Sequence, residues 1–421
     1  MPSGRPVFSA FAVSLTGNRG AASMLESAID HLTGPDVGGT VNVFTVYPKA
    51  DAKVAPRTAV KLFSGTPLAL LFRLIPLCIL YRLARALGLA GRPQRWGKGM
   101  AALLETDVCL MIGGTTFSDA KLLKVPYNVA CMLPAILLGK RAMMYSQTLG
   151  PFRKWLNRAS AQWSLSRMDF VVPRGGESLG HVRALNLPCR VEYFPDAAFS
   201  LKVDDETDRR IRAKYAHILR GKGIVGISIN SIVEKACRRL RIDHHGAWVE
   251  LIQYLRSRGY SILLIPHSMR QGSRGRHNND LLSIAEIQAM LPDMEGIHVI
   301  DEPYDCKELR VVVGLADYCV ASRFHSMISA LCNRVPVLVF GWGFQKYTEV
   351  MDEFELGQYV HDAADLSGKA LIDGFETIVN DAPAIRERIE SNLPGVQERS
   401  ARNHREATAL SPRPEKDPSK R

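Results

Sequence analysis

The sequence predicts an α/β protein made of two doubly wound, Rossmann-like domains that face a cleft. Two series of short apolar segments alternate with segments of helical spacing, the first ending near residue 200 and the second starting near residue 223. This alternation is typical of a parallel sheet covered by helices on both faces. A charged, apolar-poor stretch at 202–222 separates the two series, and a chain of 421 residues is long enough for two cores.

The first domain is expected to span residues 1–200 and the second residues 201–392. In the first domain, the expected strands lie at 7–15, 41–46, 107–112, 141–145, 169–172 and 191–194, and the first helix at 21–32. In the second domain, the expected strands lie at 223–229, 261–265, 297–300, 318–321 and 335–340, and the expected helices at about 246–258, 279–291, 305–315, 325–333 and 368–390. The remaining residues, 393–421, are rich in Pro, Arg, Ser and Glu, so we expect a disordered basic tail.

A basic segment at 53–98 is expected to be an insertion between the second and third strands. It holds nine Lys or Arg residues and no Asp or Glu, and it contains an apolar run at 68–87. A membrane-spanning helix there would bury Arg73 and Arg82 at high cost, and Pro76 interrupts the run. Two interpretations remain open: a helix that lies on an anionic bilayer, or an amphipathic helix packed on its own domain.

Composition restricts the class of function. Most of the excess positive charge in the net +12 falls in that one segment, so the charge does not indicate a nucleic-acid partner. The eight cysteines show no spacing typical of a metal or redox site, and we expect neither a metal nor a cofactor. The cysteines look like buried thiols of a reducing compartment, and no secretory signal is recognisable, so a cytoplasmic location is expected.

The motif Ser322-Arg323-Phe324-His325-Ser326 follows a short apolar strand and opens a segment with helical spacing. A helix N-terminus offers backbone N–H groups and a partial positive charge, so Arg323 and His325 beside it predict a site for a phosphate or a carboxylate. The alternative is an Arg and a His satisfied by local carboxylates. Ligand binding is favoured because open α/β sheets bind ligands at the carboxyl ends of their strands.

Five polar loops, most of them bearing glycine, follow strands of the first domain. The candidate ligand-binding residues on these loops are Gly17, Asn18, Gly113, Gly114, Asp119, Gln147, Arg174 and Asp196. Because the carboxyl ends of parallel strands meet at one edge of a sheet, the loops are expected to form one cleft wall. Taken singly, the turn at 17–20 needs no ligand, Arg174 fits a surface cation held by Glu177, and Asp196 fits a helix N-cap.

The second domain adds candidates after two further strands. His267 and the later Asp280 are candidates for proton transfer or hydroxyl binding, although an ordinary loop histidine is the alternative. Near the end of the series, Trp342 and Phe344 offer stacking faces for a sugar, and Lys346 offers another cation.

Seven motifs, taken in order, resemble the polysaccharide pyruvyl transferase family. They are Gly-Asn-x-Gly at 17–20, Gly-Gly at 113–114, Gln147 with Gly150-Pro151, Arg174 with Ser178, Pro195-Asp196, Pro266-His267 and Ser-Arg-x-His at 322–325. The resemblance covers roughly residues 8–350. It implies a GT-B-like fold and transfer of the enolpyruvyl unit of phosphoenolpyruvate onto two hydroxyls of a sugar in a cell-surface polysaccharide or lipid-linked glycan. The products would be a pyruvate ketal and phosphate.

The resemblance also implies roles for individual residues. Arg174, Arg323 and His325 would bind the donor, whose phosphate and carboxylate match two guanidinium groups and a helix N-terminus; Ser322, Gln147 and Lys346 are further binding candidates. We expect His325, or secondarily His267, to protonate the methylene carbon of the donor. Asp196 or Asp119 would orient or deprotonate the sugar hydroxyls.

Two features depart from the family pattern. Ala21-Ala22-Ser23 stand where family members often carry an acidic residue, which puts the role of the loop at 17–20 in doubt. The segment 53–98 is longer and more apolar than the pattern requires, which would suit an enzyme that is peripheral at the inner membrane face and acts on a lipid-linked glycan.

Two other functions remain as alternatives. The first is a GT-B glycosyltransferase that uses a nucleotide sugar, for which no acidic ribose-binding residue is identifiable. The second is a non-catalytic scaffold, which would have no need to gather cations at strand ends.

Overall fold

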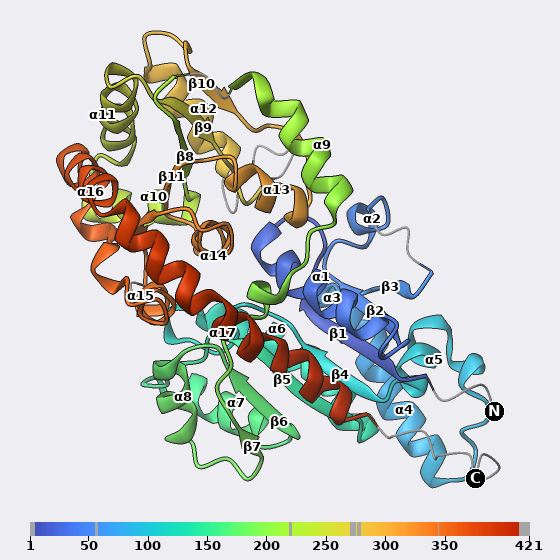
Figure 1. Cartoon of the computed structure of the whole chain (residues 1–421). Coiled ribbons are helices and arrows are strands. Elements are labelled where there is room, and N and C mark those ends of the chain that lie inside the picture. The colour runs from blue at the N-terminus through green and yellow to red at the C-terminus, as the bar shows by residue number, and fades with distance from the viewer. Residues whose placement is uncertain are drawn as a thin grey trace. The chain divides into compact units, whose positions relative to one another are not determined.

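The computed structural model describes residues 5–54, 58–218, 221–269, 275, 279–343 and 345–411. The chain forms two compact units (Figure 1). Unit 1 comprises Met1–Thr16, Met24–Ala197 and Arg399–Arg421, and unit 2 comprises Gly17–Ser23 and Ala198–Glu398. Each unit holds one parallel sheet with helices on both faces, which confirms the predicted fold class of two doubly wound units.

The sheet of unit 1 has seven parallel strands in the order β3-β2-β1-β4-β5-β6-β7. They are β1 (Val7–Val13), β2 (Thr40–Thr45), β3 (Val60–Ser64), β4 (Val108–Met111), β5 (Arg141–Gln147), β6 (Phe170–Pro173) and β7 (Arg190–Val191). The order reverses between β1 and β4, so the loops that follow these two strands flank the topological switch point. β3 was not predicted from the sequence, and it shows that the segment 53–98 contributes an edge strand to the sheet.

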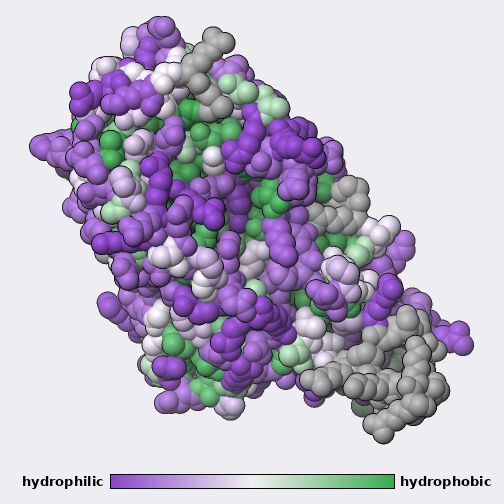
Figure 2. Space-filling model, viewed as in Figure 1, coloured by the Kyte–Doolittle hydropathy of each residue, from purple (hydrophilic) through white to green (hydrophobic). Residues whose placement is uncertain are grey.

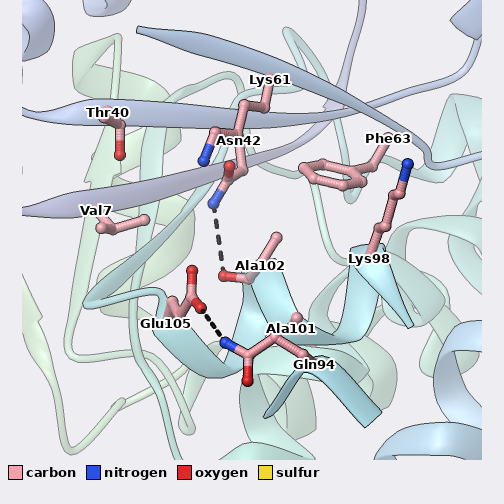
Figure 3. A pocket seen from close by; sticks show the side chains of 10 residues that line it. All are labelled: Val7, Thr40, Asn42, Lys61, Phe63, Gln94, Lys98, Ala101, Ala102 and Glu105. Carbon is pink, nitrogen blue, oxygen red and sulfur yellow. Dashed lines mark hydrogen bonds between the residues drawn. The ribbon is translucent and has the colours of Figure 1, made fainter. Parts of the chain in front are cut away.

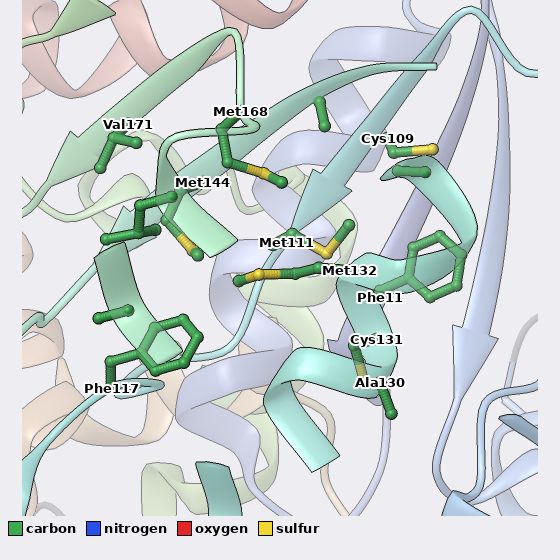
Figure 4. Close-up of a cluster of buried hydrophobic side chains, with 14 of the residues drawn as sticks. Phe11, Cys109, Met111, Phe117, Ala130, Cys131, Met132, Met144, Met168 and Val171 are labelled. Atoms are coloured by element: carbon green, nitrogen blue, oxygen red, sulfur yellow. The ribbon is translucent and has the colours of Figure 1, made fainter. Parts of the chain in front are cut away.

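The helices of unit 1 connect successive strands. They are α1 (Arg19–Thr33), α2 (Pro48–Asp51), α3 (Pro67–Ala69), α4 (Ile75–Ala86), α5 (Lys98–Glu105), α6 (Val125–Leu138), α7 (Trp155–Leu165) and α8 (Gly176–Arg183). The core on one face of the sheet contains Phe11, Met111 and Met144 from the strands, packed against Cys131 and Met132 of α6 (Figure 4). Because helices cover both faces of the sheet, the strands read as continuous apolar runs rather than as alternating ones.

Unit 2 repeats the arrangement with six parallel strands in the order β10-β9-β8-β11-β12-β13. The strands are β8 (Ile224–Ser228), β9 (Ser261–Leu264), β10 (Ile297–Val299), β11 (Tyr318–Ala321), β12 (Val337–Gly341) and β13 (Val360–Asp362). The helices are α9 (Asp205–Tyr215), α10 (Ser231–Leu240), α11 (His244–Ser257), α12 (Asp280–Met290), α13 (Cys306–Val313), α14 (Phe324–Cys332), α15 (Gln345–Asp352) and α16 (Gly368–Asn380). Its switch point lies between β8 and β11, next to the predicted anion-binding motif.

The prediction of a disordered tail at 393–421 is wrong for the described part of that range. Helix α17 (Ala382–Ala409) continues through it, and its last turns belong to unit 1. Most of the buried side chains there are polar and form hydrogen bonds: Ser400 Oγ donates to the carbonyl of Asp196 at 2.7 Å, and Asn403 Nδ2 donates to the carbonyl of Pro195 at 3.0 Å. The segment was misread because it buries hydrogen-bonded polar groups, whereas the prediction looked for apolar ones.

His404 anchors the same helix on unit 1. Its ring stacks on His31 of α1 with 3.8 Å between the ring centres, and its Nδ1 lies 2.5 Å from the hydroxyl of Tyr145 in β5. Both His404 and Tyr145 are buried. The end of α17 therefore covers one face of the first sheet, next to α1 (Figure 1).

On the face shown in Figure 2, hydrophilic side chains predominate and apolar side chains gather in small patches. None of the eight cysteines, which all lie in described parts of the chain, forms a disulfide, and six are buried. This agrees with the expectation of buried thiols.

Candidate functional site

Three of the seven motifs come together in unit 2. The loop at 17–20 lies against the loop after β9: the N–H of Arg19 donates to the carbonyl of His267 at 3.1 Å, and Ser268 Oγ donates to the carbonyl of Gly17 at 3.1 Å. The Oδ1 atom of Asn18 accepts from the N–H of Gly20 at 3.0 Å and so caps the start of α1. These contacts give the loop a structural role at the edge of the second sheet.

Arg323 lies directly before α14 and is held by Asp280 at the start of α12. Its Nε donates to Asp280 Oδ2 at 2.9 Å, and its Nη2 donates to Asp280 Oδ1. Asp280 is fully buried and also accepts the backbone N–H groups of Ser231, His267 and Ser268. The carboxylate therefore fixes the guanidinium in a bidentate pair and ties together three loops at the carboxyl ends of the strands.

Gly20 and His325 are in close contact. A Cβ atom on Gly20 would lie 2.1 Å from Nδ1 of His325, far inside van der Waals contact. The imidazole on the first turn of α14 is therefore packed directly against the backbone of the 17–20 loop. This gives a steric reason for glycine at position 20, independent of any ligand.

His267 is buried and uncharged near neutral pH. Burial, and then the positive charge of Arg323, lowers the pKa of His267 to about 3. Its Nδ1 lies 3.2 Å from the hydroxyl of Ser228, and its Nε2 has no hydrogen-bond partner among the described residues. A neutral imidazole with so low a pKa is poorly suited to deliver a proton.

The remaining candidates of unit 2 lie close to the same edge. Ser322 is buried, and its Oγ donates to the carbonyl of Ser228 at 3.0 Å, so its side chain joins β11 to β8. Lys346 lies over the ring of Tyr347, 4.9 Å from the ring centre, and Trp342 is partly exposed. Phe344 lies outside the described residues.

The other four motifs come together in unit 1. The N–H of Thr148 donates to the carbonyl of Gly114 at 2.9 Å. The N–H of Arg174 donates to the carbonyl of Gln147 at 3.0 Å. The Oγ of Ser178 accepts the N–H of Leu149 at 3.2 Å. The neighbouring parallel strands β4, β5 and β6 carry these loops, which therefore lie at one edge of the sheet, as predicted. Gly113 lies in the same loop, where a Cβ atom would crowd Thr116 Cγ2 at 3.1 Å and Ala12 Cβ at 3.3 Å.

Arg174 forms a buried ion pair with Asp196. Its Nη1 lies 2.5 Å from Asp196 Oδ2, and its Nε donates to Thr148 Oγ1 at 2.9 Å. Gly114 lies beside the same guanidinium: a Cβ there would be 4.0 Å from Nη2. The fold thus gives Arg174 an acidic partner, Asp196, which stands directly before the 3-10 helix at Ala197–Ser200.

Two candidates of unit 1 have contacts that explain them structurally. Gln147 is buried, and its Nε2 donates to the carbonyl of Met111 at 2.7 Å, which links β5 to β4. Asp119 accepts the N–H of Arg153 at 2.8 Å and Nδ2 of Asn157 at 2.9 Å, so it fixes the start of α7.

Sequence reasoning missed several residues that hold the predicted ones in place. Thr148 supports Arg174, Ser231 supports Asp280, and the hydroxyl of Tyr347 donates to the carbonyl of Ser322 at 3.0 Å. A signal was present, because Ser228, Asn230 and Ser231 form a polar cluster directly after a buried strand.

A cavity of about 430 Å³ lies in unit 1 at the opposite edge of the sheet (Figure 3). It is lined by Val7 and Thr40 at the amino ends of β1 and β2, and by Lys61, Lys98 and Glu105. Since open α/β sheets bind ligands at the carboxyl edge, this cavity is not the predicted site.

Within the described residues, Glu234, His245 and Glu286 place three potential metal-ligand atoms close together. Burial alone would raise the pKa of Glu234, but the nearby imidazole of His245, 3.9 Å away, and the hydrogen bond from Ser283 outweigh it and lower the pKa to about 2. Glu234 also forms an ion pair with Arg238. The cluster thus reads as a polar contact between α10, α11 and α12.

Comparison with solved structures supports the fold. A Listeria monocytogenes protein described as a UDP-N-acetylglucosamine 2-epimerase superposes with a TM-score of 0.61 at 14% identity, covering 95% of this chain and 94% of that one. HepE from Anabaena, solved with UDP-glucose, gives 0.57 at 11% identity over 96% and 98% of the two chains. Sucrose-phosphate synthase from Thermosynechococcus elongatus gives 0.57 at 13% identity over 97% and 100%. At these identities the likeness shows the GT-B-like fold alone.

Sequence comparison adds the family. The amylovoran biosynthesis protein AmsJ of Erwinia amylovora is 20% identical over 291 residues, which are 68% of this chain and 69% of AmsJ. The family model of polysaccharide pyruvyl transferases matches residues 18–343, a range that contains every site motif described above except Gly17. The chain therefore belongs to the polysaccharide pyruvyl transferase family and is a transferase that acts on polysaccharide.

Proposed function

We propose that this transferase uses phosphoenolpyruvate as its donor and builds a cyclic pyruvate ketal on two hydroxyls of a sugar, with release of phosphate. The observation that carries this proposal is the arrangement of Arg323 and His325. Both stand at the start of α14, with Arg323 held by the buried Asp280 and His325 packed against Gly20. A fixed guanidinium and an imidazole beside a helix N-terminus suit a small substrate that carries a phosphate and a carboxylate.

The proposed reaction begins with proton transfer from His325 to the methylene carbon of the donor, which leaves an oxocarbenium-like centre at the adjacent carbon. The first sugar hydroxyl adds there and gives up its proton. The carbon–oxygen bond to phosphate then breaks, and phosphate leaves with its charge stabilised by Arg323. The second hydroxyl adds to the same carbon, loses its proton and closes the ketal. His267 is not retained as an acid because its pKa is about 3.

Arg174, at the carboxyl edge of the sheet of unit 1, is a further proposed ligand-binding cation. Since Asp196 is fully buried and paired with Arg174, we assign Asp196 to positioning that guanidinium rather than to deprotonating a hydroxyl. Asp196 and Asp280 thus have equivalent roles in the two units. Each holds an arginine at the carboxyl edge of its own sheet.

The acceptor is a polysaccharide, or its precursor, by membership of the family. We propose that the precursor is a lipid-linked glycan and that transfer takes place in the cytoplasm at the inner membrane face. The basic segment 53–98 supports this location, because it combines positive charge with exposed apolar side chains.

The test is thermal stabilisation of the purified protein by phosphoenolpyruvate, UDP-glucose, GDP-mannose and inorganic phosphate. A ligand present at about 100 times its dissociation constant adds about 2.7 kcal/mol to the stability of the folded state. We expect stabilisation by phosphoenolpyruvate and not by nucleotide sugars. Stabilisation by a nucleotide sugar alone would contradict the proposal and favour a glycosyltransferase.

Variants at Arg323 and His325 assign the roles. Arg323→Lys keeps a charge for Asp280 but loses the bidentate geometry, so the stabilisation by phosphoenolpyruvate is expected to disappear. Arg239→Gln, an exposed arginine of α10, is the matched control and should leave it unchanged. His325→Gln should keep folding and lose phosphate release from phosphoenolpyruvate in the presence of acceptor. Full stabilisation by phosphoenolpyruvate in Arg323→Lys would overturn the assignment of Arg323.

A further inference from the structure

The helical segment Pro67–Ala86 has two apolar sides. One side carries Leu70, Leu74 and Cys78, which are buried in the core of unit 1. A five-residue π-helix at Leu70–Leu74 joins α3 to α4, and Pro76, which has no N–H to donate to the preceding turn, follows it in the first turn of α4. The segment is apolar enough to cross a membrane by length and composition, yet only 22% of its apolar window is buried within the protein.

The other side of the segment exposes large apolar side chains to solvent. Leu68 is 70% exposed, Phe72 78%, Leu83 58% and Leu87 73%. Ile79 is also exposed and completes the series. With roughly 3.6 residues per turn, these positions recur on one face along the whole segment. A stripe of this length is unusual on a surface that faces only water.

Positive charge borders this stripe. Arg73 follows Phe72 in the sequence, and Arg82 precedes Leu83. Because each residue turns the helix by roughly 100° about its axis, the two arginines flank the stripe on opposite sides, and both are exposed. The wider segment 53–98 carries nine Lys or Arg residues and no acidic residue. An apolar face with cationic borders matches the boundary between acyl chains and anionic headgroups.

The same features exclude a spanning helix and disfavour a second copy of the chain. A spanning helix would be surrounded by lipid, whereas Leu70, Leu74 and Cys78 are already packed against unit 1. In a two-fold symmetric dimer, the segment would meet its own copy and bring arginine against arginine with no acidic partner.

We propose that the segment Pro67–Leu87 docks on the surface of an anionic lipid bilayer. Leu68, Phe72, Leu83 and Leu87 enter the acyl boundary, and Arg73 and Arg82 contact lipid phosphates. Docking rests on, and gives a structural basis to, the proposed location at the inner membrane face, and it does not depend on the donor chemistry. It would hold unit 1 at the surface where a lipid-linked saccharide is presented.

The test is co-sedimentation of the full chain with vesicles of phosphatidylcholine alone or with about 30% phosphatidylglycerol. We expect binding to the anionic vesicles, and a partition coefficient that falls at least about tenfold on phosphatidylcholine alone or in high salt. Phe72→Ser with Leu83→Ser should lower binding by about tenfold or more, and so should Arg73→Gln with Arg82→Gln.

Leu240→Ser with Arg239→Gln is the matched control, because these exposed residues lie on α10 of unit 2. It should bind vesicles like the wild type. Equal binding by the apolar-stripe variant and the wild type would overturn the proposal. The proposal would also be overturned if the wild type self-associated and the variant Phe72→Ser with Leu83→Ser did not. Because neither readout uses phosphoenolpyruvate, failure here is distinguishable from failure of the proposed reaction.

Discussion

Substituting Gly20 with alanine tests whether the first loop controls the imidazole of His325. The added Cβ would lie 2.1 Å from Nδ1, and ordinary contact begins at 3.4 Å, so the ring must move by roughly 1.3 Å. Misplacing a catalytic group by about 1 Å can reduce the rate about 100-fold. We therefore expect a loss of kcat of about 100-fold, which corresponds to about 2.7 kcal/mol of transition-state stabilisation.

The assay is phosphate release from phosphoenolpyruvate, with cell-surface polysaccharide stripped of its ketals by mild acid as the acceptor. Gly180→Ala is the matched control, since Gly180 is an exposed position within α8 where a Cβ meets no atom within 4 Å. Alanine stabilises a helix interior relative to glycine by up to about 1 kcal/mol, so the control should be as stable as the wild type and fully active. If Gly20→Ala kept a kcat within about threefold of the wild type, the contact would not position His325.

Three other substitutions test the buried polar groups. Asp280→Asn should cost about 3–5 kcal/mol in the free energy of unfolding, because Arg323 is left buried without its counter-charge; a loss below about 1 kcal/mol in urea denaturation would contradict the pairing. The pKa of His267 is about 3 in the folded protein and about 6.5 in the unfolded chain. Between these two pH values the unfolded chain binds more protons than the folded protein. The free energy of unfolding therefore falls as the pH decreases from about 6.5, by up to about 1.4 kcal/mol per pH unit. His267→Asn should therefore show a shallower loss of melting temperature between pH 7 and 5, and an unchanged slope would argue that His267 is not buried neutral. His404→Ala should cost at least about 1–3 kcal/mol because it orphans the buried hydroxyl of Tyr145, whereas a melting temperature equal to that of the wild type would show that α17 is not anchored there.

The positions of most strands, and of the motifs that follow them, could be predicted from the sequence because parallel strands all end at one edge of a sheet. A buried strand followed by a polar loop places that loop at the carboxyl edge of its sheet, so Arg174 and Arg323 were both located without knowing any contact. What could not be predicted is which acid each arginine meets. Asp280 lies 43 residues before Arg323 and Asp196 lies 22 residues after Arg174, and only the fold brings each pair together.

The errors have different physical causes. β3 was missed because its five residues lie within a basic segment that was read for its helix. The last turns of α17 were read as disordered because their buried groups, such as Ser400 and Asn403, are polar. Hydropathy reveals neither a single edge strand nor a hydrogen-bonded polar contact. Sequence patterns alone therefore could not distinguish β3 from a loop, or the end of α17 from a disordered tail.

The division of the chain has a consequence for synthesis on the ribosome. Unit 1 contains the first strand of the protein and also the end of α17, so its fold is incomplete until residues near His404 have left the exit tunnel. Unit 2 has all of its strands by Asp362 and can form its sheet first. The half of the protein that is translated first is thus the half that is completed last, and a nascent chain would expose the α1 side of the first sheet until the end of α17 emerges.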